Sequence, residues 1–111
     1  MSINVKERLN QADDRLDDMW QKIHENHNHI IDMMKRDGDV ESDCINLINQ
    51  CNDILSIIAE IKILLSYVKG LTKYLALRHL KKREKLTLNL MVSTFLVKEY
   101  QRIEKEAENQ E

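Results

Sequence analysis

Proline is absent from this 111-residue chain, and glycine occurs only twice, at Gly38 and Gly70. Sheet proteins need such turn residues about every 8 to 12 positions, because tight hairpins depend on glycine, proline or asparagine conformations. Two glycines cannot supply these turns, so we expect an all-α protein. Apolar residues make up 42% of the chain and charged residues 32%. This balance is typical of a folded helical chain and is too apolar for general disorder.

Long uncharged apolar runs are also missing. The most apolar region, residues 54–68, is interrupted by Glu60 and Lys62, so we expect no membrane span. The first ten residues contain no apolar stretch behind a basic start, and we therefore expect no secretory signal. Cys44 and Cys51 lie about 10 Å apart on one helical face, beyond the roughly 7 Å limit for a disulfide. Buried, reduced thiols indicate a cytoplasmic or otherwise intracellular reducing compartment.

The two glycines divide the chain into three nearly equal parts, and each part is expected to form a helix. Each glycine follows basic residues, and both features are typical of helix C-termini. We expect Gly38 to adopt the left-handed conformation, Asp39 or Ser42 to cap the second helix, and Thr72 to cap the third. One domain, residues 1–111, should therefore contain helices at about 4–36, 40–69 and 72–107, with frayed last residues.

Seven-residue spacing predicts the packing faces of the first two helices. In the first helix, Leu9, Leu16, Ile23 and Ile30 form one row, and the companion row is broken only by Asn26. The second helix is apolar over most of its circumference, so we expect it to lie centrally, covered by more than one neighbour. This pattern predicts an antiparallel bundle or an extended helical hairpin with coiled-coil-like heptad seams. The core or oligomer seam of the second helix is assigned to Cys44, Leu47, Cys51, Ile54, Ile58, Ile61, Leu65 and Val68.

The third segment has a less regular pattern. Its expected apolar face contains Tyr74, Leu77, Leu80, Leu88, Met91 and Phe95, of which Leu88, Met91 and Phe95 are a candidate partner-binding face. Basic residues interrupt this face, which predicts a local kink or loop near residues 82–87. The alternation at the start of the uncharged run 86–97 also fits a short strand, although the chain offers no second strand to pair with it.

Charge is strongly segregated along the chain despite a net charge of only −2. Residues 1–43 carry six Lys or Arg against eleven Asp or Glu, whereas residues 69–98 carry eight against one. The favoured interpretation is that the acidic first helix and the basic third helix lie side by side, or meet across a subunit contact. The alternative is phosphate binding, although no helix-turn-helix signature or interleaved aromatic set supports it. The candidate phosphate-binding residues are Arg78, Lys81, Lys82, Arg83 and Lys85.

Residues that could support catalysis or metal binding are poorly arranged. His24 and His27 share a helix face, but His29 points about 200° away from His27, so we expect no metal site. Two isolated glycines cannot form a phosphate-binding loop, and no nucleophile lies in a recognisable elbow or triad order. We therefore expect no enzyme, no cofactor and no small-molecule substrate.

The functional hypothesis is a helix-mediated interaction protein that self-associates, most simply as a dimer, or that binds a helical protein partner. Such a protein would act as a structural, adaptor or regulatory subunit. The apolar second helix and the uncharged run 86–97 together exceed what two neighbouring helices can readily cover. The alternative hypothesis is a small nucleic-acid-binding regulator or accessory factor that uses the basic segment 73–85.

Overall fold

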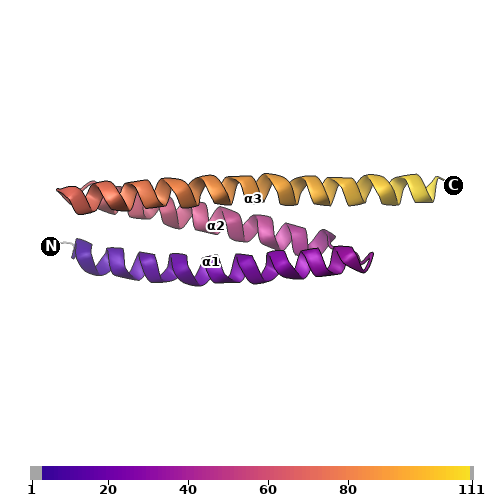
Figure 1. Ribbon diagram of the computed structural model, residues 1–111, viewed down its shortest axis with the longest axis horizontal. Coiled ribbons are helices and arrows are strands. Elements are labelled where there is room, and N and C mark those ends of the chain that lie inside the picture. The colour runs from indigo at the N-terminus through magenta and orange to yellow at the C-terminus, as the bar shows by residue number, and fades with distance from the viewer. Residues whose placement is uncertain (1–3, 111) are drawn as a thin grey trace.

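The computed structural model describes residues 4–110, which contain three helices and no strand. The helices are α1 (Val5–Lys35), α2 (Glu41–Leu65) and α3 (Leu71–Asn109), and they run antiparallel in chain order (Figure 1). The all-α fold predicted from composition is confirmed. However, α2 ends before residue 69 and α3 continues past residue 107. The outermost residues of the expected domain, 1–3 and 111, lie outside the described range.

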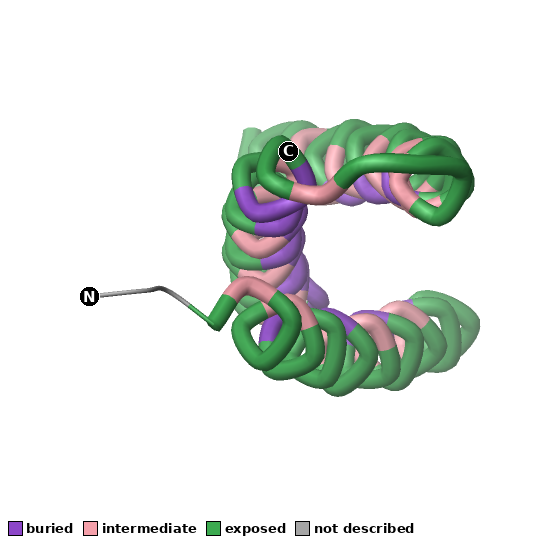
Figure 2. The backbone as a smooth tube through the Cα atoms, turned by 90° about the vertical axis from the view of Figure 1, so that its left-hand side faces the viewer, coloured by how far each residue is buried: buried purple, intermediate pink, exposed green. Residues whose placement is uncertain are grey.

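The central position expected for α2 is confirmed. Both α1 and α3 pack on α2, whereas no Cα atoms of α1 and α3 lie within 8 Å of each other. Along the long axis the helices form an open C with α2 in the middle (Figure 2). The molecule measures 65 × 24 × 18 Å. The acidic α1 and the basic α3 are therefore not adjacent within one chain, because α2 separates their backbones.

The core lies along both sides of α2. Ile23 of α1 and Leu80 of α3 are buried in it, as are seven of the eight residues assigned to the α2 seam. The eighth residue, Val68, is half-buried in the turn after α2. Asn26 donates a 2.6 Å hydrogen bond to Gln50, so the polar residue in the first seam has a specific partner on α2. Interlocking of the coiled-coil type stays a prediction.

The turn between α1 and α2 differs from the one expected. Asp37, with φ of 54°, adopts the left-handed conformation instead of Gly38. The Gly38 and Asp37 N–H groups donate to the carbonyls of Met33 at 2.8 Å and Met34 at 3.1 Å, which is a Schellman motif. A Cβ atom on Gly38 would lie only 2.6 Å from Met33 Cε. Gly38 therefore permits a close approach and does not supply the left-handed conformation.

The two expected helix caps have different outcomes. Val40, and not Asp39 or Ser42, is the N-cap of α2, although Asp39 one position earlier accepts a 3.0 Å hydrogen bond from the Glu41 N–H. Thr72 does not cap α3, because the helix begins directly after Gly70, which has φ of 106°. None of the helices in the described range is long and apolar enough to cross a bilayer.

The third helix runs without interruption from Leu71 to Asn109, so the kink expected near residues 82–87 and the alternative strand are both wrong. The residues that it turns toward α2 match those expected only in part. Leu80 is buried and Leu77 packs on the core, but Tyr74, Leu88 and Phe95 are exposed. Instead, α3 packs with a row spaced at seven residues, which consists of Leu80, Thr87, Thr94 and the half-buried Gln101.

Hydrogen bonds explain how polar side chains can occupy this inward row. The Thr87 hydroxyl donates to the Arg83 carbonyl at 2.8 Å, and the Thr94 hydroxyl donates to the Leu90 carbonyl at 2.7 Å. Each hydroxyl is therefore satisfied within its own helix, which removes the main energetic penalty for burying it.

Gln101 anchors the distal half of α3 to the turn between α1 and α2. Its side-chain amide donates to the Gly38 carbonyl at 3.1 Å and accepts from the Val40 N–H at 3.1 Å. Lys105 adds an ion pair with Asp39 at 2.6 Å. Beyond these contacts the end of α3 projects past the other two helices (Figure 1).

Candidate interaction surface on the third helix

The outer face of α3, the side turned away from α2, carries a stripe of large apolar side chains. Their exposed fractions are 42% for Leu88, 57% for Val92, 50% for Phe95, 61% for Leu96 and 56% for Ile103. Val92 follows Leu88 by four positions, Phe95 follows Val92 by three, and Ile103 follows Leu96 by seven, offsets that keep side chains on one side of a helix. We call these five residues the apolar stripe.

Helix geometry explains why the apolar stripe faces away from the core. Val92 follows the buried Thr87 by five positions, and Leu96 follows the buried Thr94 by two. At about 100° per residue, these offsets rotate the side chains by about 140° and 200° from the buried row. The burial of two threonines therefore turns apolar residues toward solvent.

The three residues of the candidate partner-binding face do not lie on one side of α3. Leu88 and Phe95 are exposed and belong to the apolar stripe, but Met91 is half-buried on the side nearer α2. The pattern read from the sequence did not include Val92, Leu96 or Ile103. The seven-residue row from Leu80 to Gln101 is the signal in the sequence that identifies them. If threonine is allowed at inward positions, this row faces α2 and the three residues lie opposite it.

The five candidate phosphate-binding residues, which we call the basic cluster, do not all face the same way. Arg78, Lys81, Lys82 and Lys85 are exposed, and none of the four forms an ion pair within the described residues. Arg83 instead points toward α1, where it donates a 3.0 Å hydrogen bond to Asp17 and lies 5.5 Å from the centre of the Trp20 ring. Four cations are therefore available for intermolecular contacts, and the fifth holds two helices of one chain together.

Carboxylates dominate the far end of α3. Arg102 pairs with Glu99 at 2.9 Å and with Glu106 at 2.7 Å along the helix surface. The hydrogen bond from Arg102 lowers the pKa of Glu99 below its ordinary value. Glu104 and Glu108 are exposed and form no ion pair among residues 4–110. Glu104 and Glu108 lie toward the turn between α1 and α2, beside Gln101 and Lys105. The outer side of α3 therefore carries basic residues before the apolar stripe, and Glu99 and Glu106 with Arg102 toward its end.

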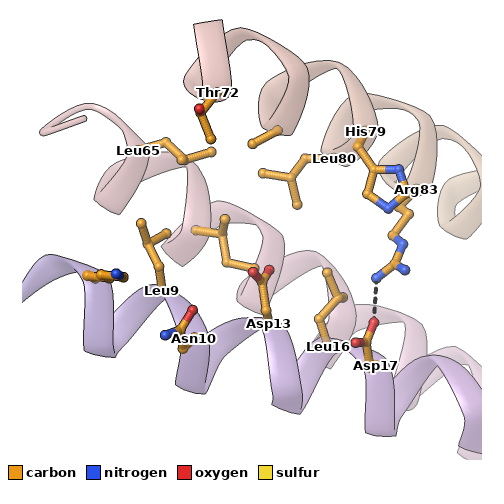
Figure 3. Close-up of a pocket in the computed structure, with 13 residues that line it drawn as sticks. Leu9, Asn10, Asp13, Leu16, Asp17, Leu65, Thr72, His79, Leu80 and Arg83 are labelled. Atoms are coloured by element: carbon orange, nitrogen blue, oxygen red, sulfur yellow. Dashed lines mark hydrogen bonds and ion pairs between the residues drawn. The ribbon is translucent and has the colours of Figure 1, made fainter. Parts of the chain in front are cut away.

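A cavity of about 390 Å³ lies where the first turns of α1 and α3 approach the end of α2. Asp13, His79 and Arg83 line it together with apolar side chains that include Leu16 and Leu80 (Figure 3). Partial burial, with the nearby Asp17 carboxylate, raises the pKa of Asp13. Each polar side chain that lines the cavity is exposed or half-buried. Water would therefore compete for every polar contact, and we assign the cavity no ligand.

The histidines of α1 contact different neighbours. His24 lies edge-on to Trp20 with ring centres 5.2 Å apart, and His29 lies 3.5 Å from the Asp43 carboxylate of α2. Across the described range, no three His, Cys, Asp or Glu side chains gather closely enough to hold a metal ion. The two cysteines are fully buried, and burial raises the pKa of Cys51 to about 11. Thiols of this kind are poor nucleophiles at neutral pH.

The apolar stripe is the surface on which exposure, regular spacing and flanking charge occur together. Its five side chains lie on a single continuous helix that is anchored to the bundle by Gln101. No protein-family model, curated protein or solved structure matches this chain. Function must therefore be inferred from the physical features of this surface.

Proposed function

We propose that this chain is a non-enzymatic interaction protein that self-associates through the outer face of α3, most simply as a dimer. In this role it acts as a structural, adaptor or regulatory subunit. The observation that supports the proposal is the exposure of the apolar stripe on a helix whose opposite side is already packed against α2.

The apolar surface that a single chain leaves in water favours association. From Leu88 to Ile103 the apolar stripe covers about 22 Å of helix, at 1.5 Å per residue. Burying apolar surface stabilises an assembly by about 25 cal/mol per Å². Exposed apolar patches larger than a few hundred Å² are uncommon on monomers and mark interaction sites. Since a two-fold dimer is the simplest closed assembly, a second copy is the favoured occupant over a different helical protein.

We also propose that the protein acts in a cytoplasmic or other reducing compartment. Cys44 and Cys51 are both free thiols in the core. Buried thiols of this type are retained as small apolar side chains where disulfides do not form.

The test of self-association compares two variants that place a carboxylate at equally exposed apolar positions. Leu96→Glu changes the apolar stripe, whereas Ile63→Glu changes α2, where Ile63 is 63% exposed. Light scattering coupled to size exclusion should give twice 13.2 kDa for the wild type and for Ile63→Glu. Leu96→Glu should give 13.2 kDa with unchanged helix content. A monomeric wild type at micromolar concentration would refute the proposal.

Nucleic-acid binding is the second candidate function. The observation that favours it is the set of four exposed cations on α3 that form no ion pair with residues 4–110. If these cations bind phosphates, retention on DNA or RNA should fall steeply with salt, with a log–log slope of several units. Retention that is negligible at physiological salt would exclude this function.

A further inference from the structure

We propose that two copies of this chain pair antiparallel along the outer faces of α3, so that the basic segment of each copy lies beside the acidic end of the other. The inference rests on the proposed self-association and adds the orientation and the register of the interface. It follows from the order of charges and apolar residues on one exposed side of α3.

The two ends of α3 carry opposite charge on either side of the apolar stripe. Residues 78–85 contain five cationic side chains and one carboxylate. Residues 103–110 contain three carboxylates and one ammonium group. In an antiparallel pair, these two segments lie beside each other at both ends of the contact. A parallel pair would instead place basic beside basic and acidic beside acidic, and like charges at close range oppose pairing.

The apolar stripe selects a register for the antiparallel pair. A two-fold axis near residue 94 places Val92 of one copy beside Leu96 of the other, twice by symmetry. The same axis brings Lys82 of one copy beside Glu106 of the other. Sliding one copy by seven residues, the next shift that keeps the same faces together, sets Leu96 beside Lys85 or beside Glu99. Sliding toward Glu99 also sets Val92 beside Ile103, but it moves the basic segment past the end of the other helix. Only the register centred near residue 94 sets Val92 beside Leu96 and, at the same time, residues 78–85 beside residues 103–110.

The surface is available to a second copy without rearrangement of the bundle. The outer face of α3 points away from α2, and α1 lies across the open side of the C from α3 (Figure 2). At the acidic end, Arg102 already pairs with Glu99 and Glu106. Glu104 and Glu108 instead lie toward the turn between α1 and α2, beside Gln101 and Lys105. The carboxylates that face outward are Glu99 and Glu106, and a cation of a second copy, such as Lys82, can share Glu106 with Arg102.

Cysteine crosslinking between the ends of α3 tests the orientation. The variants Lys82→Cys and Glu106→Cys carry thiols at exposed positions that are 24 residues, about 36 Å, apart along the helix. Each variant alone and an equimolar mixture are treated with a short bis-maleimide. Wild-type protein receives the same treatment as a control, since Cys44 and Cys51 are buried. The antiparallel pair should give at least about tenfold more crosslinked dimer in the mixture than in either variant alone.

The possible outcomes separate this inference from the proposed function. Efficient crosslinking of each variant with itself would show a parallel pair and overturn the inference. Absence of crosslinks in all three samples, with a light-scattering mass of twice 13.2 kDa, would overturn the arrangement and leave self-association intact. A single-chain mass for the wild type would overturn both.

Discussion

Arg83 of α3 donates a 3.0 Å hydrogen bond to Asp17 of α1, across the open side of a bundle in which these two helices make no backbone contact. The same guanidinium lies 5.5 Å from the centre of the Trp20 ring. Arg83 therefore links two helices whose Cα atoms come no closer than 8 Å.

The two contacts of Arg83, with Asp17 and with the Trp20 ring, should contribute unequally to the free energy of unfolding. Asp17 is largely exposed, so Asp17→Asn should lower the free energy of unfolding by less than about 1 kcal/mol. Arg83→Ala should lower it by about 1 to 2 kcal/mol, because this change also uncovers the Trp20 ring and removes the aliphatic stem of the side chain. Urea unfolding measures both values. A larger loss for Asp17→Asn than for Arg83→Ala would contradict this assignment.

The middle of α2 should dominate the stability of the fold. Ile58 and Ile61 are buried between α1 and α3, and replacing either with Ala should lower the free energy of unfolding by about 2 to 5 kcal/mol. Asp14→Ala, on the exposed side of α1, should change it by less than about 0.5 kcal/mol. Chemical denaturation checks all three variants. Equally mild losses at both isoleucines would show that α2 is not the core helix.

The Cys51 thiol should make stability depend on pH in the alkaline range. Burial raises the pKa of Cys51 from 9.0 to about 11, so the unfolded chain releases this proton at lower pH than the folded chain. The contribution is therefore complete below pH 9 and is lost as pH rises toward 11. This thiol alone should make the protein about 1 kcal/mol less stable at pH 10 than at pH 8. Unfolding of Cys51→Ala at both pH values provides the control, and an equal decline in the variant would exclude this cause.

Replacing Lys81, Lys82 and Lys85 with Gln distinguishes a charge-assisted protein interface from a phosphate-binding site. Helix propensity is nearly unchanged, so the fold should survive. In the protein interface, the dimer dissociation constant should rise several-fold at 0.01 M salt and less at 0.1 M, because the Debye length falls from about 30 to about 10 Å. Analytical ultracentrifugation at both salt concentrations measures this change. Submicromolar DNA or RNA binding by the wild type, abolished in the variant with assembly unchanged, would favour the phosphate-binding function.

The second helix could be read from the sequence because both of its packing rows are apolar. From Leu47 to Leu65, every member of these rows is buried where the seven-residue spacing places it. The regular pattern is sufficient in this helix because the position between two neighbours demands apolar residues on both sides.

The faces of the third helix could not be predicted in the same way, because its inward row contains polar residues and its outward side contains apolar ones. Polarity alone places Thr87 and Thr94 at the surface, yet hydrogen bonds to carbonyls of the same helix allow them to be buried. The candidate partner-binding face was consequently rotated toward Met91. A kink was expected at the basic cluster, but most of its cations point into solvent and Arg83 finds Asp17, so the helix continues.

Small-angle X-ray scattering of the wild-type chain at micromolar concentration directly tests pairing along α3, because one curve reports both mass and dimensions. Pairing along α3 predicts a forward scattering that corresponds to twice 13.2 kDa and a radius of gyration above the 18.0 Å of the single chain. Because the axis lies near the middle of α3, the longest dimension should exceed 65 Å only modestly. A mass of 13.2 kDa with a radius of gyration near 18.0 Å would contradict the account.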